Sequence, residues 1–363
     1  MAKYNANPNK EKYKVKKSMS TYIIGEIGQN HNGSVDIAKL IVELVSRPIR
    51  EEYFGLDLKP MNAVKLTKRD LREELSSSQM NRIYDSPNSF GRTYGEHRRF
   101  LELSDEQHFE VFCYAKGRGL DFVETLCSPS CLSILKLFSP DFLKVASRDL
   151  TNLPLLEALA ETRIPIILST GMAGQEELDK ALEIISKHHN DISILHCVSQ
   201  YPTAPQNLNL RTIPFLKKNY SQYRIGFSDH TIGIAAPTVA VGMGAEIIEK
   251  HITIDRRMKG TDQAGSLGPD GVLRMVRDIR VAEMWMGEEA LYIDESVQAA
   301  KEKLERSIAS KRDIKKGEII TEKDIHLLSP GDGFKWIEKS SVIGKEAAMD
   351  IPKDEIIYSK CLK

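Results

Sequence analysis

The chain has 363 residues, of which 41% are apolar and 28% are charged, and its formal net charge is zero. This length suits a barrel of roughly 250 residues followed by a smaller domain. The balanced charge excludes the basic surface expected of a protein that binds nucleic acid or an anionic membrane, so any anion site must be local. Residues 1–20 are basic and lack an apolar run, so we expect a flexible tail with no secretion signal and no membrane helix.

The five cysteines favour a reducing compartment. They are odd in number and show no CxxC spacing. Cys127 and Cys131 stand four residues apart, but no nearby pair of His or Cys residues completes a zinc site. We therefore expect free thiols and a cytoplasmic protein.

From Tyr22 onward, eight short apolar runs alternate with amphipathic helical stretches, which is the pattern of parallel βα units. The runs are residues 22–25, 62–66, 121–125, 142–147, 164–170, 192–197, 223–230 and 245–251. Nearly continuous apolar strands are typical of a sheet covered on both faces. The sequence therefore predicts an α/β fold, a (β/α)8 TIM barrel, over residues 21–287.

Each apolar run ends in polar residues. In a barrel of this kind the carboxyl ends of the strands meet on one face, where the active sites of the fold lie. Serine and threonine could simply mark the place where polarity resumes, but charged side chains in a covered sheet need partners or a function. The charged and imidazole side chains at these ends are Glu26, Lys65, Lys144, His196, His230, Glu249 and His251.

The remaining sequence predicts a second, smaller domain. Residues 288–303 are a charged stretch that we interpret as a linker. Residues 304–363 show short strand patterns separated by Gly and Pro turns, which indicate a β-rich module. A module of under about 60 residues has a marginal core, so we expect it to lean on a neighbour.

His230 and His251 end the seventh and eighth predicted strands, beside Asp229 and Glu249. Two imidazoles from adjacent strand ends can hold one divalent cation and leave positions open for water and substrate. A single histidine there would more often pack internally, but the pair favours a metal site. His196 is ambiguous, and we assign it no role.

Lys65 and Lys144, with the hydroxyls of Thr125, Ser147 and Ser169, suit a small phosphate compound that also carries a carboxylate. A Schiff-base lysine, as in barrel aldolases, is a competing interpretation, because a desolvated lysine at a strand end serves that chemistry too. Either lysine alone could also be a structural partner of a strand-end carboxylate.

Glu26 lies in GEIGQNHNG (25–33), where flanking glycines let the backbone approach a ligand, so it is the best candidate for a general acid or base. This stretch closely resembles sialic acid synthases, and so do TYGEHRRFLELS (93–104), ILSTGM (167–172), LHCVSQYPTAP (195–205), FSDHTIG (227–233), IEKHITID (248–255) and KGTDQAGSLGPD (259–270). The segment RSIASKRDIKKGEIITEKDI (306–325), followed by LSPGDG, resembles the antifreeze-like or SAF domain of that family.

The resemblance covers nearly the whole chain in order. It implies that phosphoenolpyruvate and a divalent metal, Mn²⁺ or Mg²⁺, bind at the top of the barrel, and that C3 of phosphoenolpyruvate attacks the aldehyde of an amino sugar. It also implies a homodimer in which each C-terminal domain reaches over the partner's barrel. The implied contacts are His230 and His251 to the metal; Lys65, Thr125, Lys144, Ser147, Ser169 and Ser228 to phosphoenolpyruvate; Tyr201 and Asp262 to the sugar; and Glu26, with Lys65 and Lys144, in catalysis.

The sequence departs from the family pattern at positions expected to face the sugar. Thr67 stands where the family usually has glutamine, and Ser329 stands where bacterial members usually have arginine. A sugar other than plain N-acetylmannosamine, either di-N-acylated or phosphorylated, would account for both changes. A third departure, the insertion at 47–62, joins a helix to a strand and should lie away from the chemistry.

A non-catalytic interpretation treats the chain as an antifreeze-type binding protein with an inactive barrel. The retained histidines, lysines and Glu26 argue against it, because an inactive barrel has no reason to keep them together.

Overall fold

The computed structural model describes residues 20–53 and 55–363. The chain divides into two compact units, one ending at Gly287 and the other running from Glu288 to Lys363. Except for Ser20, the tail expected at residues 1–20 lies outside the described residues. None of the helices in the described ranges combines the length and the apolar character needed to cross a membrane.

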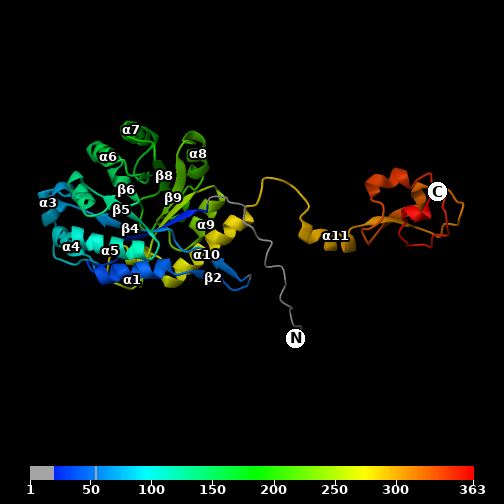
Figure 1. The fold of residues 1–363 in the computed structure, drawn as a ribbon, viewed down its shortest axis with the longest axis horizontal. Helices are drawn as coiled ribbons and strands as arrows, with labels where there is room; N and C mark the ends of the chain where they lie inside the picture. The colour runs from blue at the N-terminus through cyan, green and yellow to red at the C-terminus, as the bar shows by residue number, and fades with distance from the viewer. Residues whose placement is uncertain (1–19, 54) are drawn as a thin grey trace. The chain divides into compact units, whose positions relative to one another are not determined.

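Eight parallel strands close into a barrel in the first unit, which confirms the predicted fold (Figure 1). Each strand pairs with its sequence neighbours in the barrel, and β1 closes the ring by pairing with both β10 and β4. The strands are β1 (Tyr22–Gly28), β4 (Ala63–Lys68), β5 (Asp121–Leu126), β6 (Phe142–Val145), β7 (Ile166–Ser169), β8 (Ile192–Cys197), β9 (Arg224–Asp229) and β10 (Ile247–His251).

Helices connect the strands and surround the barrel (Figure 1). The α-helices are α1 (Val35–Ser46), α2 (Leu71–Glu74), α3 (Ser77–Asn81), α4 (Tyr94–Leu101), α5 (Asp105–Gly117), α6 (Leu153–Glu161), α7 (Gln175–Ser186), α8 (Thr212–Asn219), α9 (Ala235–Gly242) and α10 (Pro269–Trp285). Short 3-10 helices add η1 (Pro129–Lys136), η2 (Ser147–Asp149), η3 (Pro205–Asn207) and η4 (Gln263–Gly265). Four of the α-helices, α2 to α5, lie between β4 and β5, so this is the connection with the most helices.

The insertion after α1 folds as a small antiparallel hairpin of β2 (Ile49–Glu51) and β3 (Leu56–Leu58). It lies between the end of α1 and the start of β4, and so at the amino ends of the barrel strands. This position agrees with the expectation that the insertion lies away from the chemistry, although the sequence did not indicate a hairpin.

Alternation along the strands builds the barrel interior in layers. One layer is a fully buried apolar cluster of Ile24, Ala63, Val123, Ile167, Leu195 and Ile247. Side chains two residues apart on a strand point to the same face. The next inward positions are therefore the polar residues Glu26, Lys65, Thr125, Ser169, Cys197 and Glu249, which stand directly above the apolar layer.

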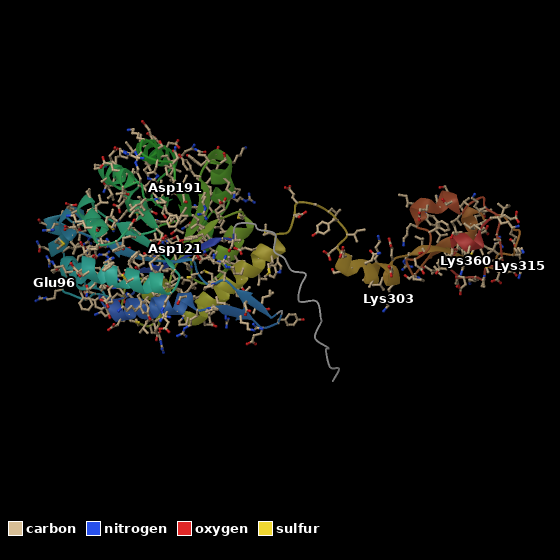
Figure 2. All side chains as sticks on the ribbon, viewed as in Figure 1. Glu96, Asp121, Asp191, Lys303, Lys315 and Lys360 are labelled. Atoms are coloured by element: carbon tan, nitrogen blue, oxygen red, sulfur yellow. The ribbon has the colours of Figure 1, made fainter. Side chains whose placement is uncertain are left out.

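A capping box defines the start of α4. The amide of Glu96 donates to Thr93 Oγ1 over 3.2 Å, and the Glu96 carboxylate accepts the amide of Thr93 over 3.1 Å. This reciprocal pair satisfies amides that an open helix end would leave without partners. Glu96 lies at the periphery of the barrel unit (Figure 2), so its carboxylate is used for the cap and not for the barrel interior.

The second unit is small and β-rich, as predicted. It begins with η5 (Glu295–Val297) and α11 (Gln298–Leu304) and contains an antiparallel pair, β11 (Ser307–Ser310) and β12 (Ile325–Leu328), with η6 (Glu322–Asp324), η7 (Trp336–Ser341) and η8 (Ser359–Cys361). Isolated bridges such as Ile314 to Ile351 join the remaining extended segments. Its core is a separate cluster centred on Ile308, Ile320, Val342 and Ile357.

All five cysteines are free thiols, and four of them are buried. Cys113, on α5, is the exposed one. The absence of disulfides agrees with the expectation from cysteine spacing.

Candidate active site

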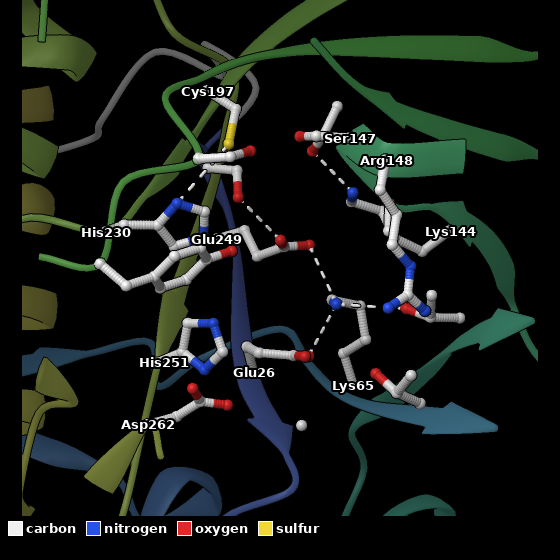
Figure 3. A pocket seen from close by; sticks show the side chains of 18 of the residues that line it. Glu26, Lys65, Lys144, Ser147, Arg148, Cys197, His230, Glu249, His251 and Asp262 are labelled. Atoms are coloured by element: carbon white, nitrogen blue, oxygen red, sulfur yellow. Dashed lines mark hydrogen bonds and ion pairs between the residues drawn. The ribbon is translucent and has the colours of Figure 1, made fainter. Parts of the chain in front are cut away.

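A cavity of about 280 Å³ opens at the carboxyl ends of the barrel strands. It contains all the site residues that the sequence predicted in the barrel, and Figure 3 shows several of them pointing toward one another from different strands and loops. These residues are Glu26, Lys65, Thr67, Thr125, Lys144, Ser147, Ser169, Tyr201, Ser228, His230, His251 and Asp262. Ser329 is in the second unit, where its hydroxyl donates to the carbonyl of Leu304 over 2.9 Å.

Lys65 lies between two buried carboxylates. Its Nζ is 2.7 Å from Glu26 Oε2 and 3.7 Å from Glu249 Oε2, and it donates to Thr125 Oγ1 over 3.2 Å. All three charged side chains are at most 7% exposed. One lysine therefore forms ion pairs with two carboxylates in a buried region of the barrel.

The two carboxylates respond differently to this arrangement. Burial, with the nearby charge of Glu249, raises the pKa of Glu26 to about 7 despite the attraction of Lys65. Burial also opposes ionisation of Glu249, but Lys144, Lys65 and a 2.9 Å hydrogen bond from Ser228 outweigh it and lower its pKa to about 2. Glu249 is therefore the permanent anion of the pair, and Glu26 can exchange a proton near neutral pH.

Lys144 is held deep in the barrel by neutral groups. Its Nζ donates to Ser169 Oγ over 2.6 Å and to the carbonyl of Val145 over 2.9 Å, and the residue is 2% exposed. Burial lowers its pKa. Ser147 completes this side of the cavity by accepting the amide of Gly171 over 3.0 Å. Lys144 forms no direct ion pair among the described residues, so an incoming anion would be a favourable partner.

His230 and His251 face each other across the other side of the cavity, with ring centroids 5.6 Å apart. Nδ1 of His230 donates to the carbonyl of Val198 over 2.9 Å, which leaves its Nε2 free to act as a ligand. Nδ1 of His251 is buried and has no hydrogen-bond partner. Burial lowers the pKa of His251 and so favours the neutral imidazole, the form that binds metals.

These residues fit a divalent cation, but incompletely. In the part of the chain that the structure describes, no three His, Cys, Asp or Glu side chains are arranged as a ready metal site. Two imidazole nitrogens are available, and Asp262 lies beside His251 (Figure 3). Such a partial set is suited to a catalytic cation that takes water and substrate as its other ligands.

Tyr201, Asp262 and Thr67 are the residues of the barrel unit that were expected to face the sugar. The Tyr201 ring centroid is 4.0 Å from that of His230, and the tyrosine is 60% exposed. All three residues line the cavity. The sugar contacts implied by the resemblance are thus brought together with the lysines and histidines, apart from Ser329.

Several cavity residues were not among the predicted site residues. Glu249 was noted at its strand end but was given no role, and Cys197 could have been found from the sequence, because each lies two positions beyond an inward apolar residue of its strand. Arg69, Arg98 and Arg148 also line the cavity, and they come from loops and α4, for which no periodic signal existed. His196, which was left without a role, points away from the cavity and hydrogen-bonds to the carbonyl of Leu208 over 2.7 Å.

Comparison with known proteins identifies similar chains. Residues 59–290 match the model of the NeuB family, and residues 305–363 match the SAF domain. The chain is 32% identical to N-acetylneuraminate-9-phosphate synthase of Homo sapiens, over 93% of this chain and 92% of that one. It is 33% identical to N,N'-diacetyllegionaminic acid synthase of Legionella pneumophila, over 92% of both. The solved N-acetylneuraminic acid synthetase from Leptospira borgpetersenii, in complex with citrate, is 29% identical with a TM-score of 0.65, over 77% of this chain and 90% of that one.

Proposed function

The chain belongs to the NeuB family, and on this premise we propose that it is a nonulosonic acid synthase. The reaction condenses phosphoenolpyruvate with an N-acyl mannosamine-type sugar and water, and releases phosphate. The observation that carries the proposal is a single cavity with two buried lysines and several hydroxyls on one side and two free imidazole nitrogens on the other. The similar proteins named as synthases of such acids support it.

In this proposal Lys65 and Lys144 bind phosphoenolpyruvate. The hydroxyls of Thr125 and Ser169 already hydrogen-bond to the two ammonium groups, and in the complex they turn to the phosphate and carboxylate oxygens. With Ser147 and Ser228 they replace the water that these anions lose on entering the barrel.

His230 and His251, with Asp262 nearby, would hold a divalent cation, Mn²⁺ or Mg²⁺. When bound, this ion would polarise the aldehyde oxygen of the open-chain sugar. Tyr201, stacked near His230, would position the sugar on the same side of the cavity.

Two σ bonds to carbon form in the proposed reaction and one breaks, while the C=C bond of phosphoenolpyruvate and the C=O bond of the aldehyde become single bonds. C3 of phosphoenolpyruvate attacks the sugar aldehyde to form the new C–C bond, and water adds at C2. The C–O bond to phosphate then breaks, and phosphate leaves. Glu26 takes the proton that the attacking water loses and passes it on to the sugar oxygen formed from the aldehyde. Its carboxylate lines the cavity, and its pKa, about 7, matches this task.

A Schiff-base aldolase on the same barrel is the alternative, and the lowered pKa of Lys144 is the feature that would serve it. The comparisons do not favour it, because the relatives are named as synthases. They do not favour a non-catalytic antifreeze-type protein either. Borohydride with pyruvate should trap an aldolase as a covalent adduct, whereas the synthase gives none.

The test of the proposed function is phosphate release from phosphoenolpyruvate, measured with a panel of mannosamine-type and bacillosamine-derived sugars. Release that requires both a sugar and a divalent metal is the expected result. Phosphoenolpyruvate carrying ¹⁸O in its bridging position should deliver that label to the phosphate, because the C–O bond breaks. Absence of sugar-dependent release across the whole panel would overturn the assignment.

The proposal includes a homodimer in which the C-terminal unit of one protomer acts on the partner's cavity. Its support is the small separate core of that unit and the position of Ser329 outside the barrel unit. The proposal also places the protein in the cytoplasm, and the five free cysteines support this location.

A further inference from the structure

Three arginines line the cavity, and the proposed reaction leaves them without a role. Arg69 follows β4, Arg98 lies on α4, and Arg148 lies in η2 after β6. We call these three residues the arginine cluster. They come from segments beyond the strand ends, whereas Lys65 and Lys144 lie on the strands themselves.

The arginine cluster is a connected network. Arg69 Nη1 and Arg148 Nη1 both contact Glu74 Oε1, at 2.5 and 3.0 Å. Arg69 Nε lies 3.8 Å from Glu102 Oε1, and this oxygen accepts Gln29 Nε2 over 3.4 Å. Gln29 in turn accepts a hydrogen bond from Arg98. The three guanidinium groups are thus held in fixed positions along one side of the cavity.

Arg98 is the member without a counter-charge. Its remaining hydrogen bonds, at 2.9 and 2.7 Å, go to the hydroxyl of Tyr94. Within residues 20–53 and 55–363, no carboxylate forms an ion pair with it. Glu96, two residues before it on α4, is engaged in the helix cap. A half-buried cation that lines a cavity with only neutral partners favours an anion there.

We propose that the acceptor sugar carries its own phosphate group, and that the arginine cluster, with Arg98 as the uncompensated charge, binds it. This inference rests on the proposed function and decides the substrate class that the proposed function leaves open. A guanidinium presents a rigid fork of donors that matches phosphate oxygens. The open-chain sugar has its aldehyde at one end, so a phosphate at the other end can reach the loops beyond the strands.

The anionic groups of phosphoenolpyruvate do not explain the arginine cluster. The two lysines and the hydroxyls around them already provide a deeper site for that substrate, and Lys65 and Lys144 are at most 5% exposed. Figure 3 shows Arg148 on the side of the cavity opposite His230, His251 and Asp262. A sugar whose aldehyde approaches the histidines can therefore extend its far end toward the arginines.

The test compares two sugars that differ only in the phosphate, N-acetylmannosamine and N-acetylmannosamine 6-phosphate. We expect the wild-type kcat/KM to be higher for the phosphorylated sugar, and Arg98→Gln to reduce that preference by about ten- to one-hundred-fold, the value of a charged hydrogen bond. Arg98→Lys, which keeps the charge but not the fork, should retain part of the preference. The matched control is Arg99→Gln, an exposed neighbour on α4 outside the cavity lining, which should leave the preference unchanged.

Calorimetric titration of both sugars gives an answer even if neither is turned over, since tighter binding of the phosphorylated sugar that is lost in Arg98→Gln supports the inference. If Arg98→Gln instead raised the KM for phosphoenolpyruvate and left the sugar preference unchanged, Arg98 would belong to the phosphoenolpyruvate site. That result would overturn the inference. Equal or better use of the unphosphorylated sugar by the wild type also overturns it. In that last case sugar-dependent phosphate release would still stand, so the proposed function would survive.

Discussion

Replacing Lys65 by methionine tests the electrostatic design of the cavity. The lysine Nζ lies 2.7 Å from Glu26 and 3.7 Å from Glu249. At an effective dielectric constant of about 20, these attractions correspond to about 6 and about 4.5 kcal/mol before desolvation is subtracted. Removing one partner of a buried pair typically costs roughly 3–5 kcal/mol, because the remaining charge stays buried. We expect the lower end of this range, since Glu26, with its pKa near 7, can take up a proton instead.

A double-mutant cycle separates this effect from lost packing. In the wild-type background Glu26→Gln should destabilise the barrel, because it removes a partner of Lys65. In the Lys65→Met background the same substitution should stabilise it by about 1–2 kcal/mol, because it removes a buried carboxyl group that must otherwise stay charged without a partner or take up a proton. The control is Lys39→Met, which breaks a more exposed pair with Glu110 and should shift the unfolding midpoint far less than Lys65→Met does.

The assay is urea unfolding followed by far-ultraviolet circular dichroism, to which the barrel helices contribute most. Midpoints are compared between variants that have the same slope, so that the shifts report stability. If Glu26→Gln destabilised the chain equally in both backgrounds, Lys65 and Glu26 would not be coupled, and the reasoning would be refuted.

The remaining predictions concern the metal, pH, the C-terminal unit and the sugar. His251→Ala should weaken Mn²⁺ binding in calorimetry and reduce turnover by orders of magnitude; full activity in chelated buffer would contradict the metal role. Burial raises the pKa of Glu102 to about 7 from 4.5, so its contribution to stability is complete below about pH 4.5 and is lost as the pH rises through 7. Glu102→Gln should therefore reduce the change in the free energy of unfolding between pH 4.5 and 7 by up to about 3 kcal/mol. An unchanged pH profile would refute the shift. Truncation before Arg306 should leave a barrel that binds phosphoenolpyruvate but turns over sugar poorly, whereas a fully active monomer at high dilution would exclude action in trans. If N-acetylmannosamine gave the highest kcat/KM and Ser329→Arg left it unchanged, the altered specificity expected from Thr67 and Ser329 would be wrong; each missing buried hydrogen bond should otherwise cost roughly 1–3 kcal/mol.

Strand periodicity explains why so much of the cavity could be predicted. Glu26 and Lys65 each stand two positions beyond an inward apolar residue, Ile24 and Ala63, and a period of two carries across a whole barrel layer. The same rule places Glu249, which was noted at its strand end without a role, in this layer. The sequence therefore predicts a cavity residue wherever a strand positions its side chain, because the two-residue alternation shows which residues point inward.

Loops and side-chain networks were the part that could not be predicted. Arg98 reaches the cavity from α4, far from any strand in sequence, and its role depends on contacts with Gln29 and Tyr94 that no periodic pattern encodes. The hairpin at 49–58 was missed because strands of three residues are too short to show alternation. Tyr201 and Asp262 were identified only because their surrounding motifs resemble a known family.

The exposure of a single cysteine gives the protein a natural attachment point. A maleimide dye should react with Cys113 on α5 while the other four thiols stay protected in the folded chain. Batches labelled with a donor and with an acceptor dye could then be mixed, and the growth of energy transfer would test for the proposed homodimer through exchange of its subunits. The proposed dimer could thus be tested with the wild-type sequence, without a thiol being added or removed.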